Sequence, residues 1–342
     1  MTPPKKTRLA LVIPTYNMAN HLAPLWESVD SSGLTSVLDE IIFVDDGSTD
    51  NTPCLLENFA DQSTKVRIVC LEKNRGRFLA RKTGADVAQS DQLLFLDSRI
   101  TLPADFGEAV KQSIRTKCNL VGSIDIDTSL NLFCLYWQRT HELIFWRHYR
   151  DTKQLLELTT ENYDKYLKGT TLFLCNRESF IRACNKFGEN TPLSDDTYLL
   201  RVILEDEPIF VTPCLRAKWA PRDRLLAFLG RLWERGPTFI EYHFFNHRGF
   251  FFWIVVAGLG LLVGLLSLFI IFPKLGLLAL LGAICLLGLS TALISKNPRE
   301  FFQLMPLHML VVLTCSFSIL RGLLYHCLPK NKHRFSRRTT EN

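Results

Sequence analysis

Short apolar runs and amphipathic stretches alternate along the first hundred residues. The runs have the continuous hydrophobicity of strands buried on both faces of a sheet, and the stretches between them suit helices. Such alternation indicates a parallel sheet covered by helices. The predicted strands lie within 8–17, 39–50, 65–73 and 91–98, and the predicted helices within 21–32, 52–62 and 78–90.

The pattern loosens after residue 100. Residues 131–150 form an aromatic-rich amphipathic stretch, residues 169–184 a strand followed by a helix, and residues 192–205 a helix that opens with two carboxylates. We expect an α/β domain, Rossmann-like with a mostly parallel sheet, over residues 1–222. An amphipathic interfacial segment is expected at 223–248.

Two long apolar runs follow. Residues 249–271 carry no charged side chain, and a second run at about 275–295 comes after a Pro-Lys turn. Each is long enough to cross a ~30 Å hydrocarbon core as a helix. A third segment at about 304–325 contains His308 and Arg321, so it suits a span, a re-entrant segment or an interfacial helix. We favour a span, which gives two to three transmembrane helices within 249–328.

The formal net charge of +6 is concentrated in two basic clusters, at 216–235 and in the tail 329–342. Near membrane helices, such clusters contact anionic lipid or mark the cytoplasmic side. Three spans would place the tail outside, against this tendency, whereas two spans with an interfacial third segment would place it inside. The sequence leaves both open. No recognisable nucleic-acid-binding module is present, so nucleic acid is not an expected partner.

The N-terminus and the cysteines indicate the compartment. The apolar run before Pro14 is too short for the h-region of a signal peptide, so the polar domain is expected to stay in the cytoplasm. The whole chain is then an integral membrane protein, expected at a bacterial inner or plasma membrane. Ten cysteines are scattered without a C-x-x-C pair, and several stand in apolar runs. We expect free, buried thiols rather than disulfides.

Polar side chains stand where the predicted strands end. Tyr16, Asp45, Asp46 and Asp97 all fall at such ends, and parallel sheets bind ligands outside the carboxyl ends of their strands. The segment 45–50 also suits an ordinary turn with a helix cap. That turn does not need two adjacent carboxylates, one of which could accept a base N–H or a ribose hydroxyl.

A basic cluster follows at 75–82. Arg77 and Arg81 are spaced one helical turn apart and share a face, and a helix start rich in cations is a suitable seat for a diphosphate. A solvated basic face is the alternative for Arg75 and Lys82. It suits Arg81 less well, because Arg81 follows the apolar residues 78–80.

Four motifs in order, VIPTYN, EIIFVDDGSTD, NRGRFLARKTGA and LLFLDSR, resemble the family-2 glycosyltransferases, which have the GT-A fold. The resemblance covers about the first hundred residues, with weaker agreement to about residue 236. It implies a nucleotide-sugar donor, most often UDP-linked, and an inverting transfer. By position, Tyr16 would lie against the nucleobase, Asp46 would bind its edge and Arg81 would face the phosphates. The implied donor-binding set is Pro14, Tyr16, Asp45, Asp46, Arg77, Arg81, Asp97 and Arg99.

Metal dependence is open. By the resemblance, Asp97 takes the place of the first carboxylate of the family's D-x-D motif, and Arg99 stands where the second carboxylate often contacts Mn²⁺ or Mg²⁺. A guanidinium cannot be a ligand to such a cation. Asp97 remains the one metal candidate, and we favour a rebuilt site in which Arg99 orients Asp97 or neutralises diphosphate charge.

The resemblance also suggests catalytic and acceptor residues. Asp196, next to Asp195, matches the acidic pair in which one carboxylate is the general base; acids that favour a helix dipole are the alternative. Arg231 and Trp233 match the family's acceptor-end Q-x-x-R-W motif only in part, which makes strict processivity doubtful. An interfacial amphipathic helix explains these two residues at least as well.

Together these features predict a membrane-anchored inverting glycosyltransferase. Its acceptor would be held at the membrane, such as a lipid-linked saccharide of an exopolysaccharide or cell-envelope glycan. A polyprenyl-phosphate acceptor is one alternative, and because a phosphate is already ionised it would need no base. A catalytically weakened scaffold that binds sugar nucleotides is another, and Arg99 motivates it.

Overall fold

The computed structural model describes residues 7–187, 195–246 and 248–327. These residues form two compact units. The α/β unit comprises residues up to 127 and residues 147–220, and the helical unit comprises residues 128–146 and those from 221 onward. The predicted α/β domain at 1–222 therefore has its aromatic-rich stretch in the other unit.

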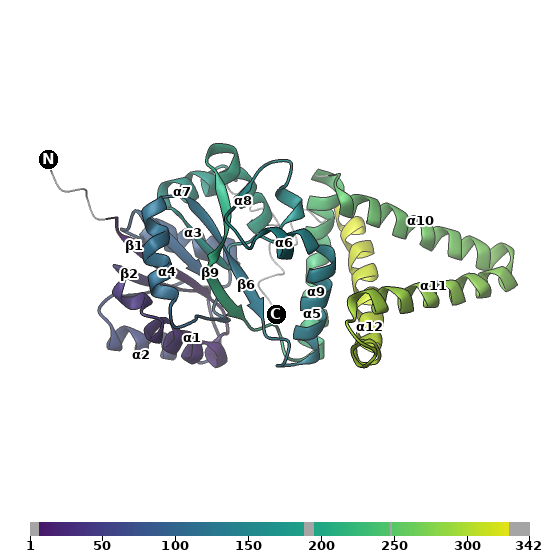
Figure 1. Ribbon diagram of the computed structural model, residues 1–342, viewed down its shortest axis with the longest axis horizontal. Coiled ribbons are helices and arrows are strands. Elements are labelled where there is room, and N and C mark those ends of the chain that lie inside the picture. The colour runs from purple at the N-terminus through teal and green to yellow at the C-terminus, as the bar shows by residue number, and fades with distance from the viewer. Residues whose placement is uncertain (1–6, 188–194, 247, 328–342) are drawn as a thin grey trace. The chain divides into compact units, whose positions relative to one another are not determined.

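A single nine-stranded sheet forms the centre of the α/β unit (Figure 1), and eight of its strands follow the order β3-β2-β1-β4-β8-β6-β9-β5 while β7 pairs with β9. The first four strands in this order are parallel, as the alternating pattern predicts. The strands are β1 (Leu9–Thr15), β2 (Glu40–Asp45), β3 (Val66–Cys70), β4 (Gln92–Leu96), β5 (Ile100–Thr101), β6 (Asn119–Ile126), β7 (Leu156–Leu158), β8 (Leu172–Asn176) and β9 (Ile209–Trp219).

The second half of the sheet is mixed rather than parallel. β8 runs antiparallel to both of its neighbours, β4 and β6, while β6 and β9 are parallel to each other. The apolar pattern of β8 could not predict its direction, because a strand buried on both faces is equally hydrophobic in either orientation. The α/β class is confirmed, with the parallel arrangement limited to β1–β4 and the β6–β9 pair.

Helices bury both faces of the sheet. Successive side chains of a strand point to opposite faces, so Leu11 and Ile13 belong to one core and Ala10 and Val12 to the other. The first core is closed by α1 (Ala19–Ser31), α2 (Thr52–Gln62) and α4 (Phe106–Ser113). The second is closed by α3 (Arg77–Val87), α7 (Arg177–Asn185) and α8 (Asp195–Asp206).

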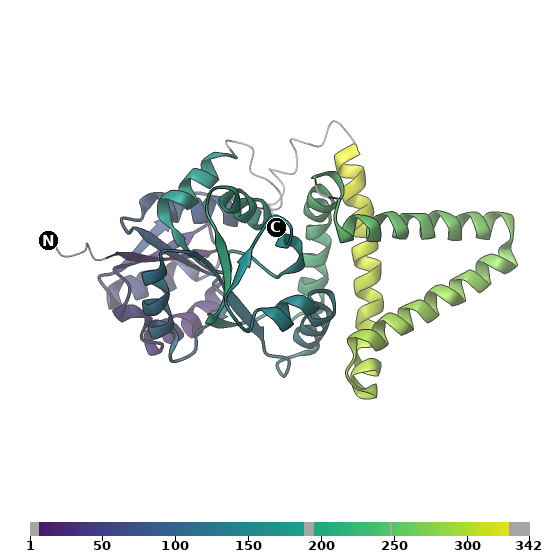
Figure 2. The same cartoon turned by 45° about the horizontal axis from the view of Figure 1, so that its top comes forward.

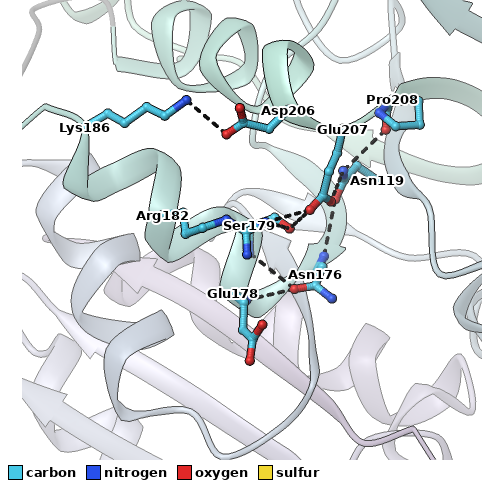
Figure 3. Close-up of polar contacts among 9 residues, drawn as sticks. All are labelled: Asn119, Asn176, Glu178, Ser179, Arg182, Lys186, Asp206, Glu207 and Pro208. Carbon is cyan, nitrogen blue, oxygen red and sulfur yellow. Dashed lines mark hydrogen bonds and ion pairs between the residues drawn. The ribbon is translucent and has the colours of Figure 1, made fainter.

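A polar network fastens the amino ends of β6 and β9 to α7 (Figure 3). The Asn176 side chain caps α7 by accepting hydrogen bonds from the backbone N–H groups of Glu178 (2.9 Å) and Ser179 (3.2 Å). Asn119 donates to Glu207 at 3.2 Å, and Glu207 also accepts from Ser179 and from Arg182. Since parallel β1, β2 and β4 end at the opposite edge, this network holds the scaffold and leaves that edge open for chemistry.

The helical unit contains no strand among its described residues. Its helices are α5 (Leu132–Ile144), α9 (Leu225–Ile240), α10 (Phe250–Ile271), α11 (Pro273–Ile294) and α12 (Pro298–Cys327), and a π-helical turn, η4 (Glu241–Asn246), joins α9 to α10. The short helix α6 (Trp146–Asp151) begins where the chain returns to the α/β unit. In Figures 1 and 2, α10 and α11 form a hairpin, and α12 runs across its open end beside α9.

Within the described residues, three helices are long and apolar enough to cross a membrane: α10, α11 and α12. Their bounds agree with the predicted segments at 249–271 and 275–295, and α12 extends the third segment by several residues at its N-terminal end. All ten cysteines are free, as predicted. Their expected burial holds only in part, because Cys134, Cys175 and Cys184 are buried while five others are exposed.

Candidate active site

The ends of β1 and β2 lie side by side at the carboxyl edge of the sheet. Thr15 pairs with Asp45 in parallel register, and the backbone N–H of Asp46 donates to the carbonyl of Thr15 at 2.8 Å. Tyr16, which follows Thr15, is half-buried. The structure therefore brings Tyr16, Asp45 and Asp46 to one edge, as the strand pattern predicts.

Asp45 shapes the turn that follows β2. Its carboxylate is buried and accepts hydrogen bonds from the backbone N–H (3.3 Å) and the hydroxyl of Ser48. Gly47 adopts a φ of +73°, and a Cβ at this position would lie 2.7 Å from the backbone of Lys73. Only glycine combines this conformation with so close an approach. The ordinary-turn interpretation thus describes Asp45 well, and its contact with donor stays a prediction.

Asp46 holds the start of the basic segment. Its two carboxylate oxygens accept the backbone N–H groups of Arg75 (2.7 Å) and Gly76 (2.8 Å). Burial raises the pKa of Asp46, and these two hydrogen bonds oppose that shift. A carboxylate has about four acceptor positions, so the predicted contact with a nucleobase edge remains open to Asp46.

Asp196 and the arginines of α3 form the polar centre of the site. The carboxylate of Asp196 lies 3.0 Å from Nη1 of Arg81 and 3.7 Å from Nη2 of Arg77. The hydroxyl of Thr170 donates to the same Asp196 oxygen at 2.7 Å. Arg81 is almost fully buried, whereas the Arg77 side chain is 43% exposed. A predicted general base and a predicted phosphate-binding arginine are therefore in direct contact.

Asp97 follows β4 and is linked to this centre through the backbone. Its N–H donates to the carbonyl of Thr171 at 3.0 Å, next to Thr170. One Asp97 oxygen accepts the backbone N–H of Arg99 at 3.0 Å. This bond orients the Asp97 carboxylate, and it uses the main chain of Arg99, which any residue at that position could supply.

The protein by itself offers few ligands for a divalent cation. In the part of the chain that the structure describes, no three Asp, Glu, His or Cys side chains lie close enough to hold a metal ion. Asp97 is the one carboxylate at the predicted position, with Arg99 where a second would stand. A cation here would depend on Asp97 together with oxygens of the donor's own phosphates.

The segment before Thr170 supports Asp196, a role that sequence reasoning missed. The Tyr163 hydroxyl donates to the carbonyl of Thr197 at 2.6 Å, and Arg201 lies over the Tyr163 ring. Lys168 is buried against Tyr163, and burial lowers its pKa to about 8. Nothing in the residues 163–170 signals these contacts, because they depend on a fold that brings this segment against α8.

The remaining predicted residues are placed as follows. Pro14 is a half-buried residue of β1. Asp195 begins α8, and its side chain lies outside the described residues. Arg231 and Trp233 lie on α9 of the helical unit, where Arg231 pairs with Glu234 at 3.2 Å and Arg321 lies over the Trp233 ring at 4.6 Å. Their predicted contact with acceptor stays untested.

A mostly parallel half-sheet with acids and a buried arginine at its carboxyl edge defines a GT-A-like glycosyltransferase domain. Residues 10–182, just over half of the chain, match the model of the glycosyl transferase family 2. The chain therefore belongs to the family-2 glycosyltransferases, whose members act on nucleotide sugars, and the resemblance inferred from the motifs is confirmed.

Curated relatives match just under a third of the chain. The chain is 33% identical over 108 residues to the succinoglycan biosynthesis protein ExoO of Rhizobium meliloti, covering 31% of this chain and 30% of ExoO. It is 32% identical over 103 residues to the undecaprenyl-phosphate 4-deoxy-4-formamido-L-arabinose transferase of Proteus mirabilis, covering 30% and 32% of the two chains. The chain thus spans about a third of the length of these relatives.

A solved structure supports the fold. The mannosyltransferase PcManGT of Pyrobaculum calidifontis, in complex with GDP-Man and Mn²⁺, superimposes with a TM-score of 0.52 at 15% identity. The match covers 96% of this chain and 89% of that one. At this identity the likeness concerns the fold alone.

Proposed function

We propose that this protein is an inverting glycosyltransferase that moves a sugar from a nucleotide-sugar donor to an acceptor held at a membrane. The observation that carries the proposal is the contact of Asp196 with Arg81 and Thr170 at the carboxyl edge of the sheet. It unites a carboxylate suited to remove a proton with a cation suited to a diphosphate. The predicted donor is UDP-linked.

The chemical step follows from this pair. The acceptor oxygen attacks the anomeric carbon, the bond from that carbon to the donor's phosphate oxygen breaks, and the nucleoside diphosphate leaves with the electron pair. Asp196 takes the proton of an acceptor hydroxyl as the new bond forms. Arg81, aided by the more exposed Arg77, stabilises the charge that develops on the leaving diphosphate.

The arrangement also relates donor binding to base strength. A carboxylate paired with an arginine is a weak base, because the neighbouring positive charge favours its ionised form. When a diphosphate engages Arg81 and Arg77, their positive charge is neutralised and Asp196 becomes more basic. Asp196 would thus be a stronger base when a donor is bound. Without a donor it would be a weaker base and would take up a proton less readily.

Two observations favour a membrane-held acceptor. The helical unit has three helices long and apolar enough to cross a bilayer. The relatives include proteins named for succinoglycan biosynthesis and for transfer to undecaprenyl phosphate. A lipid-linked saccharide is the leading acceptor class, and polyprenyl phosphate is the second. The proposal puts the catalytic unit on the cytoplasmic side, where nucleotide sugars are made.

The test uses the purified full-length protein in detergent with UDP- and GDP-linked hexoses and lipid extracts. Release of nucleoside diphosphate that requires one donor and one lipid fraction is the expected result. Mass spectrometry of the lipid product then names both substrates. Binding of the nucleotide without any turnover, with or without Mg²⁺ or Mn²⁺, would instead establish a sugar-nucleotide-binding scaffold.

The Asp196→Asn variant separates the acceptor classes. With a hydroxyl acceptor the rate should fall by about 10²–10⁴-fold, the usual contribution of a general base. With a polyprenyl-phosphate acceptor the rate should largely persist, since no proton has to be removed. Asp206→Asn is the matched control: Asp206 lies at the other end of α8, and its carboxylate pairs with Lys186 at 3.0 Å on the surface (Figure 3).

A further inference from the structure

The third apolar helix, α12, differs from α10 and α11 in what surrounds it. In the most apolar window of each helix, 6% of residues are buried in α10 and 11% in α11, but 22% in α12. Large apolar side chains are exposed along most of α10 and α11, and the length and hydropathy of both helices suit a lipid environment. Length and hydropathy alone do not show that α12 is a span like the other two.

The exposed and buried side chains of α12 lie on opposite faces. Phe302, Met309, Leu313, Phe317 and Leu324 are exposed and recur at intervals of seven, four, four and seven residues, which is one stripe of a helix. The buried set, Leu304, Leu307, His308, Val311, Ser318 and Gly322, forms the opposite stripe. One face of α12 is thus covered by protein, and the other is apolar and uncovered.

The covered face of the first half of α12 binds α5 through polar groups. Arg139 of α5 makes two hydrogen bonds to the carboxylate of Glu300, at 2.7 and 2.9 Å. Glu142 pairs with Lys296 in the α11–α12 turn at 2.9 Å, and the Tyr136 hydroxyl lies 2.8 Å from Nδ1 of His308. α5 therefore carries ionised groups along the length it shares with α12.

The covered face of the second half of α12 lies against α9. The Ser318 hydroxyl donates to the carbonyl of Trp233 at 2.6 Å, and His326 lies 3.2 Å from the carbonyl of Pro237. Gly236 and Gly322 allow this close packing, because a Cβ on Gly322 would lie 2.8 Å from the Gly236 carbonyl oxygen. Later residues of α9 meet later residues of α12, so the two helices run in the same direction.

A membrane-spanning α12 is incompatible with these partners. If α12 crossed the bilayer, α9 beside it would cross too, taking Arg231, Glu234 and Arg235 into the hydrocarbon at a large free-energy cost. Moreover, α9, α10, α11 and α12 would then be four consecutive crossings, of which the first and the fourth must run in opposite directions. They run in the same direction.

We infer that only the α10–α11 hairpin crosses the bilayer and that α12 lies in the plane of the interface. Its covered face rests on α5 and α9, and its stripe from Phe302 to Leu324 enters the lipid at headgroup depth. The lipid surface is the occupant because α12 follows α11 after a short turn, and α11 is one of the two helices that are most apolar and least covered by protein. Trp233 of α9, which stacks under Arg321 of α12, is of a kind enriched at this depth.

This arrangement determines on which side of the membrane α12 ends. The hairpin leaves and returns, so Cys327 at the end of α12 lies on the same side of the membrane as the α11–α12 turn and α5. α5 is joined to the α/β unit at both of its ends. The basic residues within 221–235 of the helical unit then lie on this same side, which satisfies the positive-inside tendency. The inference replaces the expected third span.

Depth measurements test the in-plane helix. Nitroxides are attached to single cysteines in a full-length background with all ten native cysteines replaced, in vesicles of neutral and anionic phospholipid. Labels at Phe302, Leu313 and Leu324 should share one shallow depth. A spanning α12 would put Leu313 deeper than both others by about 15 Å, since a helix rises 1.5 Å per residue. Phe250, Leu261 and Ile271 of α10 are the matched series and should show that gradient.

Sidedness gives an independent result. Single cysteines at Lys274, at Asn297 and at the native Cys327 are treated with a membrane-impermeant maleimide on either side of sealed vesicles. Cys327 and Asn297→Cys should react from one side, and Lys274→Cys from the other. Reaction of Cys327 from the side of Lys274→Cys, or a depth gradient along α12, would establish a third span and overturn the inference. Neither measurement depends on the proposed transfer reaction.

Discussion

Arg81 and Asp196 lie 115 residues apart in the sequence and 3.0 Å apart in the structure, with Nη1 of the arginine against Oδ1 of the carboxylate. Arg81 is buried, so this ion pair is little screened by solvent. Asp196 is also contacted by Arg77 at 3.7 Å and by the Thr170 hydroxyl at 2.7 Å. The pair therefore couples the α3 helix, where the donor's phosphates are predicted, to the α8 helix, where the base is predicted.

Replacing Arg81 should weaken donor binding. In Arg81→Met, a charge-assisted hydrogen bond worth about 1.5–3 kcal/mol is lost, so affinity for the nucleoside diphosphate should fall roughly 10- to 100-fold. Calorimetric titration of UDP and GDP measures this. Lys82→Met is the matched control, because Lys82 is adjacent in the same helix but pairs with Asp86 at the surface. It should change affinity by less than about twofold.

A double-mutant cycle shows whether the two residues act together. Removing either partner leaves the other without its main counter-charge, so Arg81→Met and Asp196→Asn should each lower the unfolding temperature. Once Arg81 is gone, Asp196→Asn should cost little further stability, because the interaction is already lost. Strictly additive changes in the unfolding free energy would contradict direct coupling.

Replacing Arg99 should change the metal dependence. If Arg99 neutralises diphosphate charge, the parent protein should bind nucleoside diphosphate in EDTA. Arg99→Asp should lose this binding in EDTA and regain it with Mn²⁺, since carboxylates are the ligands such a cation needs. Titrations with EDTA and with Mn²⁺ distinguish the two states. Arg115→Asp, an equal charge change at an exposed residue, is the control. A parent protein that binds nucleotide only with Mn²⁺ would disprove the hypothesis that Arg99 takes the place of the cation.

The sequence predicted most of the sheet's carboxyl edge, for a physical reason. Parallel strands read as continuous apolar runs, so the positions of Tyr16, Asp46 and Asp97 at strand ends follow from hydrophobicity alone. Arg77 and Arg81 were predicted from their helical spacing, and Asp196 from the family motifs. Their mutual contact was not predictable, because it depends on β8 and α8 closing over α3. The contact of Thr170 with Asp196 could not be predicted either, since an ordinary threonine before a strand gives no signal of its partner.

In the helical unit, hydropathy predicted the bounds of the helices but not how each helix is placed. Hydropathy predicted the bounds of α10 and α11 well, because large apolar side chains are exposed along most of both helices and few protein contacts interrupt the apolar pattern. It predicted α12 as a span, although α12 packs on α5 and α9 through Glu300, His308 and Ser318. The mean hydropathy of α12 is lower than that of α10 and α11, 1.8 against 2.9 and 2.5, but it is still high enough for a span. Only the partners of α12 distinguish an in-plane helix from a span.

The turn after β2 should depend on glycine at one position in particular. Gly47→Ala adds the strain of a positive φ and a 2.7 Å approach to the backbone of Lys73. Lys73 lies two residues before Arg75, whose backbone N–H donates to Asp46. Gly33→Ala is a matched control, because Gly33 has nearly the same φ, +71°, with nothing within 4 Å of the new Cβ. Gly33→Ala should cost about 1–2 kcal/mol in unfolding free energy, and Gly47→Ala clearly more. Equal losses would show that the close approach is unimportant.

Acid should destabilise the α/β unit through His148. This residue of α6 is buried, its Nδ1 has no hydrogen-bond partner among the described residues, and burial, reinforced by the nearby charge of Lys168, lowers its pKa to about 4. The unfolded chain has the ordinary pKa of about 6.5 and so binds the proton first. Stability is then complete above about pH 6.5 and is lost as the pH falls towards 4.

The size of that loss and its test follow from the same two pKa values. Between pH 6.5 and 5 a single group of this kind removes about 2 kcal/mol of unfolding free energy, since each pH unit is worth about 1.4 kcal/mol. Unfolding of the full chain in detergent, followed from pH 7.5 to 5, measures the slope. His148→Leu, compared at each pH with its own value at pH 7.5, should lose less stability on acidification than the parent, because leucine takes up no proton. An unchanged slope in that variant would assign the acid sensitivity to the carboxylates of the ion pairs and exclude His148 as its source.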